Sequence, residues 1–332
     1  MKTKIVYSII SSKSDVFLEE TMVSIYSLRL YNPDAVVVLV VDDQTYDSFT
    51  CSRSQINEYV SEIIVIKVPS ELSKKQKSRF LKTNLRQYIK GDYLFVDSDT
   101  IITSSLEEID TFIFPIGAVK DRHLDLEVHT HKNDIYKCAK IIGWNIGNEV
   151  RNYYNSGVFY VKDIELTHDF YKHWHDIWLD GLKKGVDIDQ PSLGKTNYLF
   201  NNIIHELDGV WNCQILTNGV PYLSNAKILH YFTSNVNNKS NYPFLLSDVS
   251  IYESIKKDGT LTTELKQRIF NAKSQFSNNY EIIGGARLTF LNTSTCAFIW
   301  WIYLKSSKVF NALEYIFSVF QNIYHKLKLV KR

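Results

Sequence analysis

Two aspartates separated by one residue are the side chains in this sequence best placed to bind a divalent cation. Asp97 and Asp99 lie in the segment YLFVDSDTII, directly after a run of apolar residues. Carboxylate oxygens are hard ligands that Mg²⁺ and Mn²⁺ prefer, and a cation held in this way neutralises the charge on a departing diphosphate. Two carboxylates on one turn can point into the same crevice. The pair therefore indicates a metal site, although a solvated turn is the usual explanation for this pattern when it occurs alone.

The segments around this pair alternate between strand patterns and helix patterns. β-branched runs separated by amphipathic stretches are typical of βαβ units, and such units predict a mostly parallel sheet whose ligands bind beyond the carboxyl ends of the strands. Asp97 and Asp99 follow such an end. We predict strands at 4–10, 35–41, 61–68, 93–96, 157–161 and 228–232, and helices at 17–30, 78–88 and 169–182.

The overall composition is that of an ordinary globular protein. Apolar residues make up 45% of the 332 residues and charged residues 22%, so a disordered or fibrous chain is not expected. A net charge of +2 argues against a broad basic surface for nucleic acid. The histidine pairs 129/131 and 173/175 are not predicted zinc sites, because side chains two residues apart on a helix face different directions.

Cysteine usage and the N-terminal segment both favour a cytoplasmic location. The four cysteines are scattered and form neither a zinc-knuckle spacing nor a disulfide framework, which is typical of a reducing compartment. The N-terminal segment MKTKIVYSII has no small-residue cleavage site after its apolar run. It reads as a buried first strand, and we expect the chain to stay in the cytoplasm.

The C-terminal part of the chain has a different character. After about residue 247 helix patterns replace the α/β rhythm, so we predict an α/β domain over 1–246 and a helical extension over 247–332. The run 296–304 is too short to span a bilayer, which needs about 20 residues. Six basic residues against one acid after Ile299 favour an anionic membrane surface as partner, and packing onto the body is the alternative. The apolar stripe of the last helix comprises Leu313, Ile316, Phe320, Ile323, Leu327 and Val330.

Several segments, in their order along the chain, resemble the landmarks of glycosyltransferase family 8. These landmarks span roughly residues 4–235 and are IVYSII, Arg79, YLFVDSDTII, YYNSGVFYVKD, DIDQPSLGKTN, WNCQ and ILHYF. The resemblance implies an α/β fold of the GT-A type, Rossmann-like with a mostly parallel central sheet. It also implies Mn²⁺ or Mg²⁺ as cofactor, a UDP-sugar as donor, and transfer of a hexose with retention of configuration.

The resemblance assigns a metal-binding role to three residues. It implies that Asp97 contacts both the ribose and the metal, that Asp99 chelates the metal, and that His230 in ILHYF is the third ligand. A neutral imidazole beside two carboxylates is a reasonable ligand set for manganese.

The resemblance also assigns residues to the donor sugar. Asn155 would contact the sugar through its amide, Asp189 would accept a hydrogen bond from a sugar hydroxyl, and Gln190 would lie near the anomeric carbon. Arg79 would contact donor hydroxyls or phosphate. Because an amide is a poor nucleophile, Gln190 favours front-side displacement. Asp189 could instead serve as the base of an inverting enzyme, so the stereochemistry stays open.

Two segments depart from the family pattern. After His230 the chain reads HYFTSNVNNKSNYPF, without the usual glycine, so Lys239 is the candidate for the lysine that grips the diphosphate. At the end of the first strand, Ser11, Ser12 and Asp15 occupy the region where the family usually has an aspartate pair and a tyrosine for uracil. The identity of the base is therefore open.

The expected acceptor is a glycan or a lipid-linked sugar, as in lipopolysaccharide or capsule synthesis. The polar segment 121–149 weakens the strand pattern, and we predict a long loop there that closes over the acceptor. A sugar-nucleotide nucleotidyltransferase is one alternative, but SSKSD lacks the glycine-rich phosphate loop expected after the first strand. A degenerate nucleotide- or carbohydrate-binding protein is another, and the intact Asp97, Asp99 and His230 argue against it.

Overall fold

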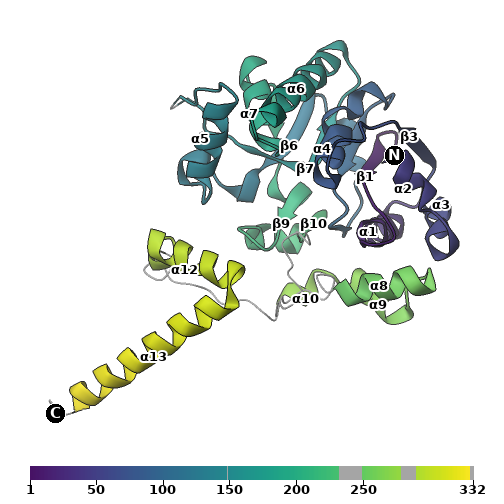
Figure 1. Cartoon of the computed structure of the whole chain (residues 1–332). Coiled ribbons are helices and arrows are strands. Elements are labelled where there is room, and N and C mark those ends of the chain that lie inside the picture. The colour runs from purple at the N-terminus through teal and green to yellow at the C-terminus, as the bar shows by residue number, and fades with distance from the viewer. Residues whose placement is uncertain (148, 232–248, 278–288, 330–332) are drawn as a thin grey trace. The chain divides into compact units, whose positions relative to one another are not determined.

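The computed structural model describes residues 1–147, 149–231, 249–277 and 289–329 (Figure 1). The chain divides into two compact units, Met1–Asn279 and Tyr280–Arg332. The first unit has an α/β architecture, whereas the described part of the second unit is helical.

A seven-stranded sheet forms the centre of the first unit, with the strand order β3-β2-β1-β4-β7-β6-β8. Strands β3, β2, β1 and β4 run parallel, β7 runs antiparallel to both of its neighbours, and β8 runs parallel to β6. Every residue of β2 is buried, as expected for an apolar strand covered on both faces. The strands are β1 (Lys4–Ile9), β2 (Val37–Asp42), β3 (Glu62–Ile66), β4 (Tyr93–Val96), β6 (Ile116–Lys120), β7 (Tyr154–Val161) and β8 (Ile204–Glu206).

A second, three-stranded sheet has the order β5-β10-β9. Its strands are β5 (Thr100–Ile102), β9 (Cys213–Gln214) and β10 (Ile228–His230). Because β10 runs antiparallel to β5, the last residue of β10, His230, pairs with the first residue of β5, Thr100. This pairing places His230 beside the residue that precedes β5, which is Asp99.

Helices cover both faces of the central sheet. Alternate residues of the strands pack against α1 (Phe17–Tyr31) on one face and against α4 (Lys74–Thr83), α6 (Glu165–Lys183) and α7 (Gln190–Leu199) on the other. Figure 1 shows these two layers on opposite sides of the strands. The first unit also contains α2 (Asp43–Asp47), α3 (Ile56–Tyr59), α5 (Lys132–Ile141) and α10 (Ser274–Ser277), and the 3₁₀ turns η4 (Asp121–His123) and η6 (Gly209–Asn212).

The pairing of β6 with β7 is irregular at one point. Ala118 pairs with Phe159, but Lys120 pairs with Tyr154, so the register shifts between Ala118 and Lys120. Extra residues on one strand of an antiparallel pair form a bulge, which bends the strand and changes the direction of its side chains.

The predicted fold class is confirmed: the structure is mixed α/β with a mostly parallel central sheet and a helical C-terminal region. The segment 121–149 differs from the predicted loop, because it contains α5 and short 3₁₀ turns. Apolar residues at helical spacing explain the difference, since they bury a small core of their own beside Trp144. These residues are Leu126, Ile135, Ala139 and Ile142.

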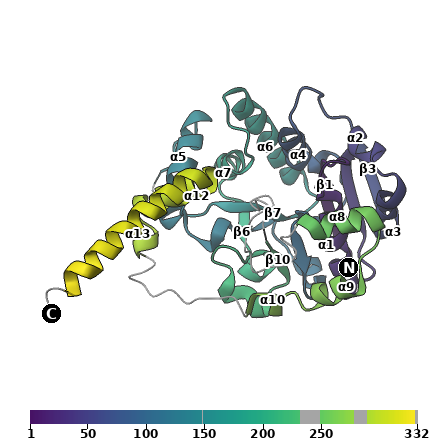
Figure 2. The ribbon, with the colours of Figure 1, turned by 60° about the horizontal axis from the view of Figure 1, so that its bottom comes forward.

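The predicted boundary between 246 and 247 differs from the division at Asn279. Helices α8 (Val249–Asp258) and α9 (Thr263–Phe270) follow the predicted boundary, yet both contact α1 of the first unit (Figure 2). Tyr252 and Ile255 of α8 are buried in the same core as the strands. The apolar faces of these amphipathic helices therefore pack against the α/β body.

The second unit contains α12 (Ser294–Lys305) and α13 (Ser307–Leu329). The side chain of Thr293 accepts a hydrogen bond from the backbone N–H of Cys296, which caps the start of α12. The stripe predicted for the last helix falls within α13, except for Val330, which lies outside the described residues. Among the helices that the structure describes, none combines the length and apolar character needed to cross a membrane.

The burial of α8 leads to a prediction about stability. Replacing Ile255 by Ala should lower the free energy of unfolding by about 2 to 5 kcal/mol, because the substitution leaves a cavity in the main core. Urea unfolding followed by tryptophan fluorescence measures this change. Ser254→Ala, at an exposed position of the same helix, is the control and should change stability by less than about 0.5 kcal/mol. Equal stability of Ile255→Ala and the wild type would exclude α8 from the folded core.

Candidate active site

Asp97, Asp99 and His230 form a group in which one potential ligand atom from each residue lies within 4.8 Å of the others. The Nε2 atom of His230 is 3.2 Å from Oδ1 of Asp99. Among the described residues, this is the one cluster of His, Cys, Asp or Glu side chains that could hold a metal ion. Asp97 directly follows β4, so the predicted position at the carboxyl end of a parallel strand is confirmed.

Gly157 of β7 lies at the centre of this group. A Cβ atom added there would be 2.5 Å from Cε1 of His230 and 2.7 Å from Oδ2 of Asp97, closer than real Cβ contacts. The carbonyl of Gly157 also accepts a hydrogen bond of 2.7 Å from the backbone N–H of Asp97. The absence of a side chain at this position is thus what allows Asp97 and His230 to approach each other.

The donor set fits a divalent cation. Two carboxylates and one imidazole supply the oxygen and nitrogen ligands that Mn²⁺ accepts, and a spacing below 4.8 Å lets one ion reach all three residues. Burial raises the pKa of the Asp97 carboxyl, with Lys82 opposing the shift and the Asp99 charge adding to it. Burial also acts to raise the pKa of Asp99, but His230, a backbone hydrogen bond and the charge of Lys82 together outweigh it, so this pKa is lowered.

Lys82 lies beside Asp97, although the sequence did not predict it as a residue of the site. Its Nζ atom lies 2.8 Å from Oδ1 of Asp97, and its side chain is only 5% exposed. Lys82 is on α4, one helical turn after Arg79, in a lysine-rich stretch that resembles a solvated helix face. The helical spacing from Arg79 was the available signal, because residues three apart lie on the same face.

A second cluster lies on the side of β7 opposite the Asp97–Asp99–His230 group. It comprises Asp189, Arg79 and Gln190. Asp189 is buried, accepts a hydrogen bond of 2.7 Å from Oγ of Ser156, and lies 3.4 Å from Nε of Arg79. Although burial acts to raise the pKa of Asp189, the charges of Lys82 and Arg79 hold it below its usual value. Gln190 begins α7 and donates to the carbonyl of Tyr154 at 3.3 Å. Asp189 is therefore ionised and already paired.

Asn155 is engaged by protein groups at both ends of its amide. Its Oδ1 atom accepts hydrogen bonds of 2.9 Å from the N–H of Gly157 and from Nδ2 of Asn212. Its Nδ2 atom donates to Oδ1 of Asp121 at 2.8 Å. Asn155 thus connects the metal-binding group with η4, at the start of the segment predicted to close over an acceptor.

Of the two remaining residues predicted to bind the donor, the structure describes only Ser11. Ser11 follows β1 and is buried in a polar network with Asp15, Thr45 and Arg53, where its Oγ donates to Asp15 at 2.6 Å. Lys239 lies outside the described residues.

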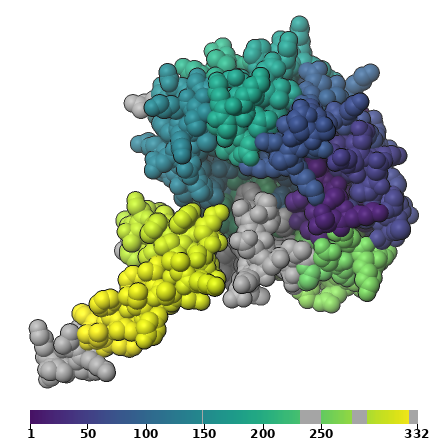
Figure 3. All heavy atoms as spheres, viewed as in Figure 1, coloured from purple at the N-terminus to yellow at the C-terminus, as the bar shows by residue number. Residues whose placement is uncertain are grey.

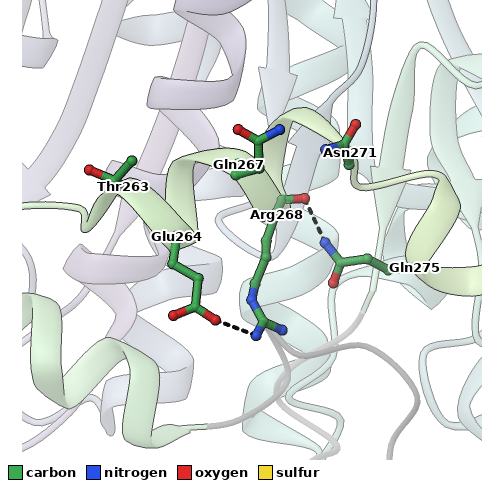
Figure 4. A pocket seen from close by; sticks show the side chains of 6 residues that line it. All are labelled: Thr263, Glu264, Gln267, Arg268, Asn271 and Gln275. Carbon is green, nitrogen blue, oxygen red and sulfur yellow. Dashed lines mark hydrogen bonds and ion pairs between the residues drawn. The ribbon is translucent and has the colours of Figure 1, made fainter.

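A surface hollow of about 400 Å³ occurs elsewhere in the first unit, along α9 and the turn after it. Figure 4 shows the polar residues that surround it, with Glu264 and Arg268 paired along the helix. None of the residues that line it belongs to the metal-binding group.

A family model described as glycosyl transferase family 8 matches residues 8–239. A sequence search among curated proteins found no significant match.

Three solved structures are similar in fold, and all three share 15% sequence identity with the chain. The apo form of mouse xyloside xylosyltransferase 1 has a TM-score of 0.47, over 70% of this chain and 98% of that one. The galactosyltransferase LgtC in complex with donor and acceptor sugar analogues has a TM-score of 0.48, over 80% and 100%. GlyE of Streptococcus pneumoniae TIGR4 has a TM-score of 0.45, over 85% and 66%. Sequence identities and TM-scores this low do not assign residue roles or substrates to this chain.

The crowding at Gly157 predicts that even a methyl group there will damage the metal-binding group. Gly157→Ala should weaken Mn²⁺ binding by roughly 10- to 100-fold, because Asp97 and His230 must move apart. Calorimetric titration with Mn²⁺ measures the change. Gly117→Ala is the matched control, since its Cβ would lie 2.7 Å from Phe114 in the same sheet but away from the site. It should lower stability and leave Mn²⁺ affinity unchanged, so equal affinities of all three proteins would contradict the prediction.

Proposed function

Because the chain belongs to glycosyltransferase family 8 and is therefore a glycosyltransferase, we propose that it transfers a hexose from a UDP-sugar to a glycan or lipid-linked acceptor. The reaction depends on a divalent metal and retains the configuration of the sugar. The acceptor belongs to surface polysaccharide or lipopolysaccharide synthesis.

The observation that carries this proposal is the grouping of Asp97, Asp99 and His230 at the carboxyl edge of the sheet. These residues would hold Mn²⁺ or Mg²⁺, which supplies the positive charge that stabilises a departing diphosphate. The crevice beyond the carboxyl ends of parallel strands is where α/β proteins of this kind bind nucleotides.

Positive charges beside this group support binding of an anionic donor. Lys82 and Arg79 lie one turn apart on α4 and are paired with Asp97 and Asp189, respectively. We assign them to the phosphates or hydroxyls of the donor, and we assign Ser11, near the end of β1, to the region of the base. Arginine and lysine are the usual partners of phosphate oxygens.

The pairing of Asp189 supports retention over inversion. A general base needs a lone pair directed at the acceptor hydroxyl, but the two carboxylate oxygens of Asp189 face Ser156 and Arg79. Its lowered pKa also makes it a weak base. Asp189 is better suited to accept a hydrogen bond from the donor sugar, and with Gln190 beside it the proposed reaction is a front-side displacement.

The second unit supports a lipid-linked acceptor at the inner face of the membrane. The described part of the second unit is coloured yellow-green to yellow in Figure 3. Exposed aromatic side chains lie along α12, and Trp300 and Trp301 are 57% and 56% exposed. Trp300 stacks on Tyr303 with ring centroids 5.3 Å apart. Aromatic rings beside basic residues favour the interface between water and anionic lipid headgroups. We propose that this unit attaches a cytoplasmic enzyme peripherally to the membrane that carries its acceptor.

The donor and metal are tested together by calorimetry with UDP, GDP and CDP, each with and without Mn²⁺. We expect tight binding of UDP only when Mn²⁺ is present. Asp99→Asn should reduce that binding by at least about tenfold, because the charged ligand is lost while the shape is kept.

Each other result has a defined meaning. Mn²⁺-dependent binding of another nucleotide would keep the metal site and reject the UDP-sugar. Wild-type binding by Asp99→Asn would reject the metal role of this residue. Failure to bind any nucleotide would favour a degenerate binding protein without catalysis.

Membrane attachment is tested by flotation of the full-length protein with vesicles of neutral lipid, or of neutral lipid mixed with an anionic one. We expect flotation with anionic vesicles alone, and its loss when Trp300 and Trp301 are both replaced by Ser. Phe270→Ser is the matched control, because Phe270 is 56% exposed but lies on α9 of the first unit. Equal flotation of the double variant and the control would contradict a membrane role for α12.

A further inference from the structure

Asn212 is a fully buried residue in contact with the metal-binding histidine. It ends η6, and its Oδ1 atom lies 3.0 Å from Nδ1 of His230. Its Nδ2 atom donates to Oδ1 of Asn155 at 2.9 Å. The amide of Asn212 therefore links the histidine to Asn155.

A backbone group fixes the direction of these hydrogen bonds. The N–H of Gly157 points at Oδ1 of Asn155 at 2.9 Å, and a backbone N–H can only donate. Asn155 must therefore present its oxygen to Gly157 and to Asn212. It follows that Asn212 presents its NH₂ group to Asn155 and its oxygen to His230.

The same reasoning applies at the other end of the network. The backbone N–H of His131 donates to Nδ1 of His129 at 3.1 Å, so the proton of a neutral His129 is on Nε2. That Nε2 atom lies 3.0 Å from Oδ2 of Asp121, while Oδ1 of Asp121 accepts from Asn155 at 2.8 Å. Both oxygens of Asp121 are acceptors, so the donors of the network all point toward this carboxylate.

These directions determine the tautomer of His230. Because Asn212 presents an oxygen, Nδ1 of His230 must carry a proton, and Nε2 is the ring atom left to bind a metal. Nε2 is the atom that faces Asp99 at 3.2 Å. The opposite tautomer would set a lone pair on Nδ1 against the oxygen of Asn212.

We propose that Asn212 is a positioning residue that holds His230 in the tautomer able to bind a metal through Nε2, and that the backbone N–H of Gly157 sets the orientation of Asn212 through Asn155. Groups behind a metal-bound histidine commonly fix its ring in this way. The inference rests on the proposed metal site, but the tautomer itself is a property of the metal-free chain.

The first test is Mn²⁺ affinity, measured by calorimetry on full-length protein without nucleotide. Asn212→Leu keeps the approximate shape but removes the acceptor, so we expect affinity to fall by roughly 10- to 100-fold. Asn212→Asp keeps an acceptor for Nδ1–H but loses the donor to Oδ1 of Asn155, so it should bind Mn²⁺ more weakly than the wild type and more tightly than Asn212→Leu. Asn32→Leu removes a buried asparagine that accepts from Leu106 in another part of the core, and it should leave Mn²⁺ affinity unchanged.

The second test reads the tautomer directly. Nitrogen chemical shifts of ¹⁵N-histidine in the metal-free protein distinguish the two tautomers, and His230→Gln identifies the signals of His230. We expect protonated Nδ1 in the wild type and in Asn212→Asp, and a shift toward protonated Nε2 in Asn212→Leu. Asn212→Ala also removes the acceptor for Nδ1–H, so it should shift the tautomer in the same direction. It provides the test of the network if Asn212→Leu does not fold.

Two results would overturn the proposal. One is an unchanged tautomer and unchanged Mn²⁺ affinity in folded Asn212→Leu or Asn212→Ala. The other is an equal loss of affinity in Asn212→Leu and Asn212→Asp, which would show that Asn212 acts only through packing. Absence of Mn²⁺ binding by the wild type would instead overturn the proposed metal site, and the chemical shifts would then decide the tautomer by themselves.

Discussion

Three residue pairs between β5 and β10 hold His230 against Asp99. Asp97 and Asp99 are close because they are near neighbours in the sequence, but His230 is distant in the sequence and reaches them only through this antiparallel pairing. The backbone N–H of Tyr231 extends the contact by donating to the carbonyl of Asp99 at 3.1 Å. The small sheet is thus the element that brings the three candidate metal ligands together, and the larger sheet supplies the edge on which they lie.

Strand β7 connects this group with the residues assigned to the donor. Asn155 and Gly157 face Asn212 and His230, whereas Ser156 between them faces Asp189. One short segment of backbone therefore contacts His230 and Asn212 on one side and Asp189 on the other. Lys82 influences both sides, because it is paired with Asp97 and its charge also lowers the pKa of Asp189.

The sequence predicted those parts of the fold and site that depend on local patterns. The apolar run of β2 and the position of Asp97 after β4 follow from residue types and spacing alone. His230 emerged only from the family resemblance, because no local pattern distinguishes a ligand from a buried histidine. Lys82 was missed since its burial depends on tertiary packing, and Asn212 was missed since its importance depends on the orientation of neighbouring amides.

The register shift between β6 and β7 limits the insertions and deletions that the chain can accept. Phe159 and Val161 face the α6 side of the sheet, and strict alternation back along β7 would turn Gly157 to that side as well. The shift instead turns Gly157 toward His230. Inserting or deleting one residue within 154–158 would exchange the groups presented on the two sides, even if every other residue were kept. The length of this segment is therefore constrained independently of its composition, whereas surface loops far from the site can gain or lose residues without reversing any side chain.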